Sequence, residues 1–358
     1  MHPSRNSMRE NSKQLRRQCL LVVTLLVASC TQPSVDCTLS PNIADPTSTT
    51  SPIHDPSLIN ANGSYYVYSS SDLGSFYQSD NLRDWRLSGQ VFDALPDWLV
   101  QQIPNADHIG APDLAFYNGQ YLYFYQSHIS NTCDAATGLA TNKSLDPESI
   151  DYQWVDRGLI LRSKPHYTDI NIYCGDENAT FNAIDAHFFV DPDQTPWLVF
   201  GSTIGGIKLV ELDPLTLKPL PNSEFVTLAQ RFLLQDDPII EAPHLRYRNG
   251  YYYLFVSFNH CCLAADTRYH VRVGRSRSIT GPYFDAQHWP LYLGGGTPLI
   301  TGDGDYIGTG HSDLFSERGH DWLVHHAKRP AEDYRAYLQI RKLRWLNNGW
   351  PSLCTEAA

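Results

Sequence analysis

The sequence predicts an all-β protein that folds as a five-bladed β-propeller, and three observations support this prediction. A turn followed by an aromatic-rich strand recurs five times. No stretch shows the apolar spacing of a long amphipathic helix. A polar residue in an apolar setting precedes each of the five turns. Five similar β units joined by loops of variable length are typical of a propeller with about four strands per blade.

The turns and strands carry the local evidence for each unit. Asn-Gly between two short apolar runs is the strongest local hairpin signal, and aromatic and β-branched residues favour pleated, half-buried strands. The five predicted turn-and-strand segments cover residues 62–69, 118–125, 194–201, 249–256 and 319–326.

The five polar residues that precede these segments are four acids and a histidine: Asp55, Asp113, Asp185, Glu241 and His311. Each stands about one strand and one turn ahead of its hairpin. The first strand of every propeller blade lines the central axis, so we expect these residues to converge at one mouth of the channel.

Such a cluster has a chemical consequence. Like charges crowded in a partly dry funnel push their pKa values apart, so that some stay protonated and others ionise near neutral pH. A protonated Glu241 beside ionised Asp residues would equip the site for general acid and base catalysis. The alternative is that the five residues cap turns at strand starts, as Asp before Pro often does.

The chain begins with an export signal. Five basic residues precede the apolar run from Cys19 to Ala28, which is too short for a comfortable transmembrane helix. This run ends in Val-Ala-Ser-Cys, which resembles a bacterial lipobox with Cys30 as the acylated residue. We therefore predict a signal peptide at 1–29, a lipid-attached Pro/Ser/Thr-rich tether at 30–50 and a propeller domain at 51–358; a simple cleaved signal is the alternative.

Removal of residues 1–29 leaves 22 Lys and Arg against 37 Asp and Glu. A surface this acidic repels phosphate backbones, so nucleic acid is excluded as a partner. We expect an exported protein of the bacterial cell envelope, anchored to a membrane or secreted.

Six cysteines remain after Cys30, and an even number in an oxidising compartment indicates disulfides. We favour a pairing of Cys133 with Cys174. Cys261 and Cys262 either form a vicinal bridge or stay free. No C-x-x-C pair occurs, which argues against a zinc ribbon.

Several motifs, taken together and in this order, resemble glycoside hydrolase family 43 and within it the endo-1,5-α-L-arabinanases. The resemblance runs from about residue 51 to 351. Its motifs are His54-Asp55-Pro56-Ser57, Ala111-Pro112-Asp113, Asn182-Ala183-Ile184-Asp185, Gly201-Ser202 with Gly205-Gly206, Ile240-Glu241-Ala242-Pro243, Cys261-Cys262 and Gly310-His311.

This resemblance implies hydrolysis of α-1,5-L-arabinofuranosidic bonds by a single, inverting displacement. Asp55 would be the base that activates water, Glu241 the acid that protonates the leaving oxygen, and Asp185 the group that orients Glu241 and tunes its pKa. An inverting pair stands roughly 6.5–9.5 Å apart.

The resemblance also implies a substrate surface and a metal. Asp113, His54, Asn182, Gly201 and Ser202 would contact or border the sugar. Family members often hold a hydrated Ca²⁺ on the axis against a histidine that matches His311. The alternative is that His311 is a hydrogen-bonded core residue.

The chain departs from the arabinanase pattern near the predicted mouth. Gly110 and Thr203-Ile204 replace aromatic residues on which a sugar ring would stack. Linkage, chain length and endo or exo action are therefore left open. The alternatives are an exo-acting arabinofuranosidase or xylosidase of the same family, or a surface glycan-binding lipoprotein without turnover.

Overall fold

The structure is a computed structural model, and it describes residues 52–130, 132–167, 172–175, 180–232, 236–302 and 305–353. The chain divides into two compact units, Met1–Asp36 and Cys37–Ala358, and all described residues belong to the second. The predicted signal peptide and tether, with Cys30, lie outside the described residues. Within the described part of the chain, no helix is long and apolar enough to cross a membrane.

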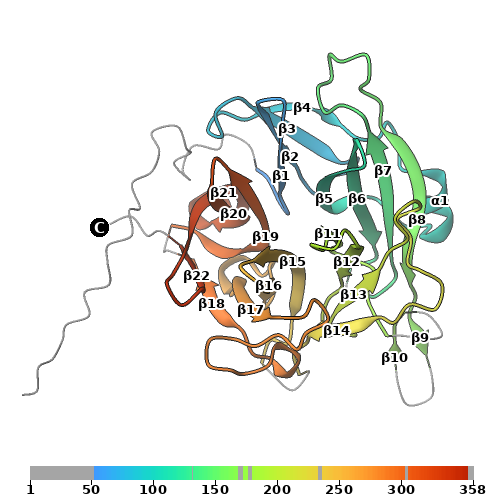
Figure 1. Cartoon of the computed structure of the whole chain (residues 1–358). Coiled ribbons are helices and arrows are strands. Elements are labelled where there is room, and N and C mark those ends of the chain that lie inside the picture. The colour runs from blue at the N-terminus through green and yellow to red at the C-terminus, as the bar shows by residue number, and fades with distance from the viewer. Residues whose placement is uncertain are drawn as a thin grey trace, which may run out of the picture. The chain divides into compact units, whose positions relative to one another are not determined.

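The second unit is all-β and folds as a five-bladed β-propeller, which confirms the predicted fold class (Figure 1). Each blade is a four-stranded antiparallel sheet whose strands follow one another in chain order. The blades comprise β1 (Ser57–Ala61), β2 (Ser64–Tyr68), β3 (Ser75–Ser79) and β4 (Arg86–Gln90); β5 (Gly110–Tyr117), β6 (Gln120–His128), β7 (Ala135–Asn142) and β8 (Val155–Ser163); β11 (His187–Val190), β12 (Pro196–Phe200), β13 (Ile207–Glu211) and β14 (Val226–Ala229); β15 (Ile240–Arg248), β16 (Tyr251–Phe258), β17 (His270–Ser276) and β18 (Thr297–Ile300); and β19 (Ile307–Glu317), β20 (His320–Arg329), β21 (Arg335–Trp345) and β22 (Pro351–Leu353).

The remaining elements are short. A two-stranded hairpin, β9 (His166–Tyr167) and β10 (Ile172–Tyr173), follows the second blade, and the described residues contain one α-helix, α1 (Asp97–Gln102). Three 3₁₀ turns complete the set: η1 (Ala264–Asp266), η2 (Leu291–Leu293) and η3 (Pro330–Glu332).

The hairpin turns form where the sequence predicts them, because their backbone demands special residues. Asn62-Gly63, Asn118-Gly119 and Asn249-Gly250 each place both central residues at positive φ, between 48° and 89°. These are the angles of a two-residue type I′ turn, whose twist matches the flanking strands. Arg318 and Gly319 adopt the same angles in the fifth blade.

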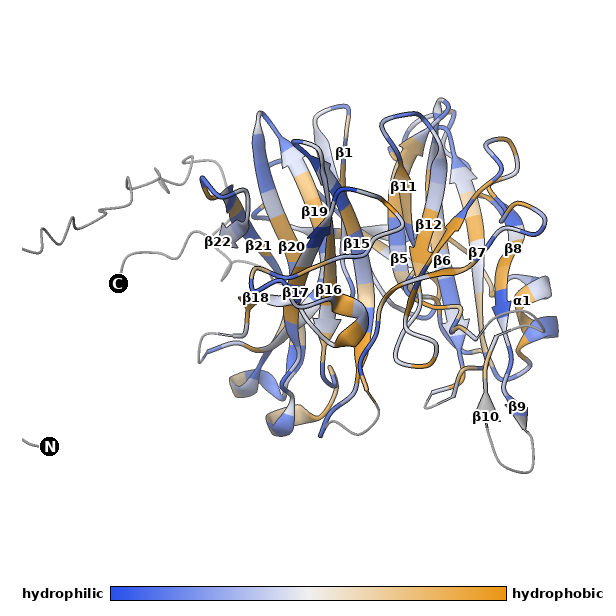
Figure 2. Ribbon diagram, turned by 60° about the horizontal axis from the view of Figure 1, so that its bottom comes forward, coloured by the Kyte–Doolittle hydropathy of each residue, from blue (hydrophilic) through white to orange (hydrophobic). Residues whose placement is uncertain are grey.

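The hydrophobic core lies between the blades. Five buried clusters each join residues of two neighbouring blades, and the last of them packs Leu58 and Val67 of the first blade against Trp322 and Val324 of the fifth. In Figure 2, hydrophobic residues, drawn in orange, accordingly recur along the strands. The ring also closes at its inner edge, where β1, β5, β11, β15 and β19 contact one another in sequence and β19 contacts β1.

Both described disulfides lie in this unit. Cys133 and Cys174 are bonded and buried, which confirms the predicted pairing. Cys261 and Cys262 form the vicinal bridge.

Candidate active site

A kinked residue lies just before, or in the first half of, each innermost strand, and the five kinks form the mouth of the axis. The kinked residues share a left-handed backbone: Asp55 (φ 50°), Ala111 (37°), Asp185 (54°), Ala242 (52°) and His311 (52°). Non-glycine residues adopt such angles at a cost, and they persist where surrounding contacts hold them. In three blades the kinked residue is itself a predicted site residue, whereas Glu241 directly precedes its kink.

The kinks are held by hydrogen bonds between blades. In four of the five positions, the backbone N–H of the kinked residue donates to a side chain of the preceding blade. That side chain lies near the end of the second strand or just after it. These bonds are Ala111 to Ser70 Oγ (2.8 Å), Asp185 to Gln126 Oε1, His311 to Ser257 Oγ (2.9 Å) and Asp55 to His326 Nδ1 (3.2 Å).

The fourth blade is the exception, and the exception links two predicted site residues. The Ala242 N–H donates to Asp185 Oδ2 at 3.0 Å. Gln126 Nε2 donates to the other oxygen, Asp185 Oδ1, at 3.1 Å. Asp185 thus fixes the backbone directly after Glu241.

Asp55 is the most heavily bonded carboxylate at the mouth. Ser70 Oγ donates to its Oδ2 at 2.6 Å, and His54 Nδ1 lies 2.9 Å from the same oxygen. His311 Nδ1 lies 3.1 Å from Oδ1. Burial alone would raise the pKa of Asp55, but the positive potential of His311 and His54 outweighs it and holds that pKa well below its usual range. Asp55 is therefore ionised at neutral pH.

Glu241 has the opposite property. Burial raises its pKa to about 8, and the nearby charge of Asp185 adds to the effect. Burial also raises the pKa of Asp185. At neutral pH the mouth therefore holds an ionised Asp55 and a protonated Glu241, which are the two states that general base and general acid catalysis require.

The two axial histidines differ in charge. Burial lowers the pKa of His311, but Asp55 overcomes this effect and raises it to about 9. Burial lowers the pKa of His326 to about 3, so its neutral ring accepts the Asp55 N–H. His311 supplies the positive charge that an ionised Asp55 needs in a dry site.

Asp113 lies one layer deeper than the other predicted acids. It stands two residues after the kinked Ala111 and is 6% exposed. Its Oδ2 accepts the Phe188 N–H at 2.9 Å, and its Oδ1 lies 2.8 Å from His187 Nδ1. Asp113 therefore lies two positions out of phase with the kinked Asp55, Asp185 and His311.

The equivalent positions of two other blades make the same kind of bond. Asp313 Oδ2 accepts the Leu58 N–H at 2.7 Å, and Ser57 Oγ accepts the Leu114 N–H at 3.0 Å. This deeper ring joins neighbouring innermost strands beneath the mouth. Asp113 therefore acts on the propeller scaffold.

Three further predicted residues support the mouth from behind. Asn182 Nδ2 donates to Ser202 Oγ at 2.9 Å, and both side chains are buried. The Gly201 N–H donates to the Ile184 carbonyl at 2.8 Å, next to Asp185. The same loop contributes Thr203, whose Oγ1 accepts the Ile240 N–H at 3.2 Å. The 201–206 loop thus braces the chain segments that lead into Asp185 and Glu241.

Position 110 does border the mouth. A Cβ added to Gly110 would lie 3.5 Å from Ser70 Oγ and 3.7 Å from Gln126 Cγ, the side chains that bond Asp55 and Asp185. The His108 ring lies 3.4 Å from the same point. A methyl group at position 110 would therefore contact His108, Ser70 and Gln126 at ordinary van der Waals distances.

Sequence reasoning missed Ser70, Gln126 and Ser257 as partners of the site, and it placed His326 in the fifth hairpin as a packing or supporting residue. All four lie at the same place in their blades, three to five residues after the buried Tyr66, Leu122, Tyr252 and Leu323 respectively. A search for a polar residue at that spacing would have found them.

A small cavity lies on the axis below the mouth, with a volume of about 20 Å³, which is room for one water-sized particle. Three carboxylates line it, from Asp113, Asp185 and Asp313, together with His311. Ser312 Oγ, which also lines it, is buried without a hydrogen-bond partner among the described residues. Carboxylate and hydroxyl oxygens suit a hard cation such as Ca²⁺.

Comparisons with known proteins identify the family of the chain. A family model described as glycosyl hydrolases family 43 matches residues 46–351. The extracellular exo-α-(1→5)-L-arabinofuranosidase of Cellvibrio japonicus is 34% identical over 309 residues, which cover 84% of this chain and 86% of that protein. The extracellular endo-α-(1→5)-L-arabinanase 1 of Bacillus subtilis is 35% identical over 305 residues, which cover 84% and 87%.

Solved structures share the architecture. The Cellvibrio cellulosa α-L-arabinanase complexed with arabinohexaose superposes with a TM-score of 0.77 at 32% identity, covering 86% of this chain and 96% of that one. The endo-arabinanase of Bacillus licheniformis gives a TM-score of 0.75 at 34% identity, covering 86% and 99%. An exo-acting and an endo-acting relative are thus similar to this chain to the same degree.

Proposed function

The chain belongs to glycosyl hydrolases family 43 and is an arabinanase-like glycoside hydrolase, and from this premise we propose that it cleaves α-1,5-linked arabinan by a single inverting displacement with Asp55 as base and Glu241 as acid. The observation that carries the proposal is that, at the same mouth, the pKa of Asp55 is lowered and the pKa of Glu241 is raised. Asp55 is held ionised, and Glu241 is held protonated until about pH 8.

The proposed reaction moves two protons. Asp55 accepts a proton from a water molecule as the water oxygen bonds to the anomeric carbon. Glu241 gives its proton to the glycosidic oxygen as the bond from that oxygen to the anomeric carbon breaks. Asp185 stays ionised, holds the Ala242 N–H and keeps the pKa of Glu241 high. The products are two shorter sugars, and the new reducing end has inverted configuration.

The direct test replaces the proposed acid. Glu241→Gln should reduce the release of reducing sugar from linear 1,5-α-arabinan by about 10²- to 10⁴-fold, the usual contribution of a general acid. Glu148→Gln, an exposed carboxylate in the second blade, is the matched control and should retain activity. NMR of the first products should show the inverted anomer. Full activity of Glu241→Gln would contradict the assignment.

We propose endo action, with exo-acting arabinofuranosidase or xylosidase activity as the alternative. The absence of an aromatic side chain at position 110 supports a mouth that admits an internal stretch of chain. Time-resolved chromatography on debranched arabinan, beside xylan, separates the two: an endo enzyme first releases a ladder of oligosaccharides, whereas an exo enzyme releases one short product from the start.

A glycan-binding lipoprotein without turnover is the other candidate. It predicts calorimetric binding of arabino-oligosaccharides with no release of reducing sugar. The retained difference in protonation between Asp55 and Glu241 supports turnover instead, because binding alone does not require a neutral Glu beside an ionised Asp.

Among the proposed substrate contacts, His54 is the one that reaches the surface. Its side chain is 33% exposed beside Asp55. We propose that His54 touches the sugar, whereas Asn182, Gly201 and Ser202 act on the sugar through the segment that carries Asp185, and Asp113 acts through the deeper ring.

We further propose Ca²⁺ as the resident ion of the axial cavity, where the surrounding carboxylates would hold it and His311 would bind it through a neutral ring after the ion has displaced the proton of that ring. Bound there, the ion would supply positive charge against three acids. Removal with EGTA should lower the temperature of thermal unfolding, and Ca²⁺ should restore it more effectively than Mg²⁺ because the cavity offers a flexible set of oxygens. An unfolding temperature that changes neither with EGTA nor with added Ca²⁺ would contradict this site.

Finally, we propose that the protein is exported and anchored through lipid on Cys30. The relatives of Cellvibrio japonicus and Bacillus subtilis are described as extracellular. Metabolic labelling with a fatty-acid analogue should mark the full chain but not Cys30→Ala. Equal fractionation of both proteins into the medium would indicate a simple cleaved signal.

A further inference from the structure

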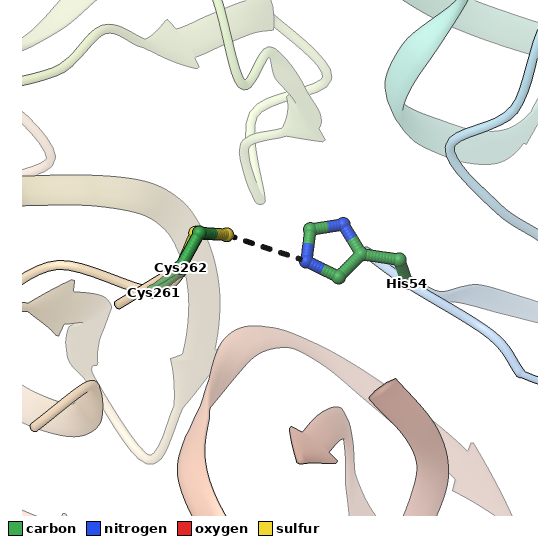
Figure 3. A group of neighbouring side chains, drawn as sticks. All are labelled: His54, Cys261 and Cys262. Atoms are coloured by element: carbon green, nitrogen blue, oxygen red, sulfur yellow. Dashed lines mark hydrogen bonds between the residues drawn. A yellow bond between two sulfur atoms is a disulfide. The ribbon is translucent and has the colours of Figure 1, made fainter. Parts of the chain in front are cut away.

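The vicinal disulfide lies at the mouth of the site. Cys261 and Cys262 follow β16 and precede η1 in the fourth blade, and they face His54 of the first blade across the opening (Figure 3). Cys262 Sγ is 4.0 Å from His54 Nε2. The other ring nitrogen, His54 Nδ1, is 2.9 Å from Asp55 Oδ2. One imidazole ring therefore separates the disulfide from the proposed base.

The loop that carries the disulfide is fixed from behind. Thr267, which is buried, donates its hydroxyl to the carbonyls of His260 (2.8 Å) and Cys261 (3.0 Å). The His260 N–H in turn donates to Asp237 Oδ2 at 2.9 Å. These bonds hold the two cysteines in one place, and a binding surface needs such preorganisation.

A buried cation supports the disulfide from the fifth blade. Lys328 of β20 is 8% exposed, and its Nζ donates to Cys262 Sγ at 3.4 Å. The sulfur is therefore held between Lys328 and His54. Cys262 itself is exposed, so its remaining surface faces the opening.

The surface that this pair offers suits the carbon face of a sugar. Three neighbouring side chains bond Asp55 through Ser70 Oγ, His311 Nδ1 and His326 Nδ1. Most of the surface of these side chains is covered. The disulfide has no polar hydrogen and presents two polarisable sulfur atoms, which make favourable dispersion contacts with C–H groups. A ring positioned over Asp55 must lie beside His54 and therefore beside Cys262.

We propose that the Cys261–Cys262 disulfide, together with the His54 ring, forms a wall of the sugar site that contacts the C–H face of the furanose ring nearest Asp55. The inference deepens the proposed function and rests on it. The disulfide is a binding group here and takes no part in proton transfer.

The kinetic test removes the disulfide and keeps the chain length. Cys261→Ser with Cys262→Ser should raise KM for arabinotetraose about fivefold, the factor that corresponds to about 1 kcal/mol of lost contact, and should change kcat less than twofold. The matched control is Cys133→Ser with Cys174→Ser, which removes the buried disulfide and should leave KM unchanged. Equal KM values in both double variants and wild type would overturn the wall.

A second measurement needs no cysteine variant. In the folded, inactive Glu241→Gln protein, dithiothreitol should reduce the exposed Cys261–Cys262 bond before the buried Cys133–Cys174 bond, as alkylation and mass spectrometry would report. Saturating arabinohexaose should slow the first reduction about tenfold or more and leave the second unchanged. Reduction of Cys261–Cys262 at the same rate with and without the sugar would overturn the inference.

The two proposals fail in different ways. A wild-type protein that releases no sugar from arabinan would remove the proposed function. An active wild-type enzyme with an unprotected disulfide and an unchanged KM in the Cys261 and Cys262 double variant would remove only the wall.

Discussion

The charge of Asp185 should set the alkaline limit of activity through Glu241. The pKa of Glu241 rises from its ordinary value of 4.5 to about 8, which corresponds to a free-energy cost of about 5 kcal/mol for ionising this side chain. Burial is the larger cause, and Asp185 is the next. In the wild type, kcat/KM should therefore fall above about pH 8, because a general acid that has lost its proton cannot protonate the leaving oxygen.

Asp185→Asn removes the charge and keeps the shape of the side chain. A unit charge at about 5 Å in an effective dielectric of about 20 contributes about 3 kcal/mol, or about two pK units. The pKa of Glu241 should therefore fall toward about 6 but stay above its ordinary value, because burial remains. Asparagine has one acceptor atom, so it keeps either the Ala242 bond or the Gln126 bond.

The assay is kcat/KM for arabinotetraose between about pH 4 and 9.5, because this parameter reports the ionisation of the free enzyme. The alkaline limb of Asp185→Asn should shift to lower pH by one to two units, and that of the control Glu148→Gln should stay in place. A limb that is unmoved, or that moves to higher pH, would refute the proposed coupling between Asp185 and Glu241.

Three further outcomes follow from the same structure. Because the pKa of Glu241 is higher in the folded than in the unfolded chain, stability should fall as pH rises between about 4.5 and 8, and Glu241→Gln should remove roughly 1.4 kcal/mol per pH unit of that slope in denaturant titrations; parallel slopes would contradict it. Gly205→Ala places a Cβ 2.3 Å from a backbone carbonyl oxygen and should cost more than about 2 kcal/mol, against about 1 kcal/mol for Gly63→Ala, whose Cβ meets nothing within 4 Å; equal losses would contradict the clash. Asp113→Ala should destabilise the fold by about 2–3 kcal/mol, and its kcat/KM should stay at least tenfold above that of Asp55→Ala. A larger kinetic loss in Asp113→Ala would place Asp113 at the sugar.

Local signals explain why so much of the fold was predictable. A type I′ turn needs two consecutive residues at positive φ, and Asn-Gly is the pair that adopts these angles most readily. The chain has this pair at Asn62-Gly63, Asn118-Gly119 and Asn249-Gly250. A strand of aromatic and β-branched residues then follows at once. Five such units, with no competing helix pattern, leave few architectures that can bury all their strands.

The same reasoning placed the polar residues on the axis but misjudged their depth. Counting back from a hairpin assumes an unbroken strand, whereas the innermost strands shift register at Gly110–Asp113 and Glu241–His244. Each shift adds residues to one strand without moving its partner. Asp113 precedes Leu122 by two positions fewer than Asp55 precedes Tyr66, and it therefore lies a layer below Asp55.

By itself, then, the sequence determined the propeller and the start of every blade, because these depend on residues a few positions apart, and its resemblance to a known family pointed to Asp55, Asp185 and Glu241 as the proposed catalytic residues. Only the tertiary structure decided which carboxyl is ionised and which backbone groups hold it. The Asp55 N–H donates to His326 Nδ1, 271 positions away, and the Asp55 carboxylate has His311 as its charge partner. Such contacts arise only when the ring closes, because the propeller brings the first and fifth blades together after the whole chain has been laid down.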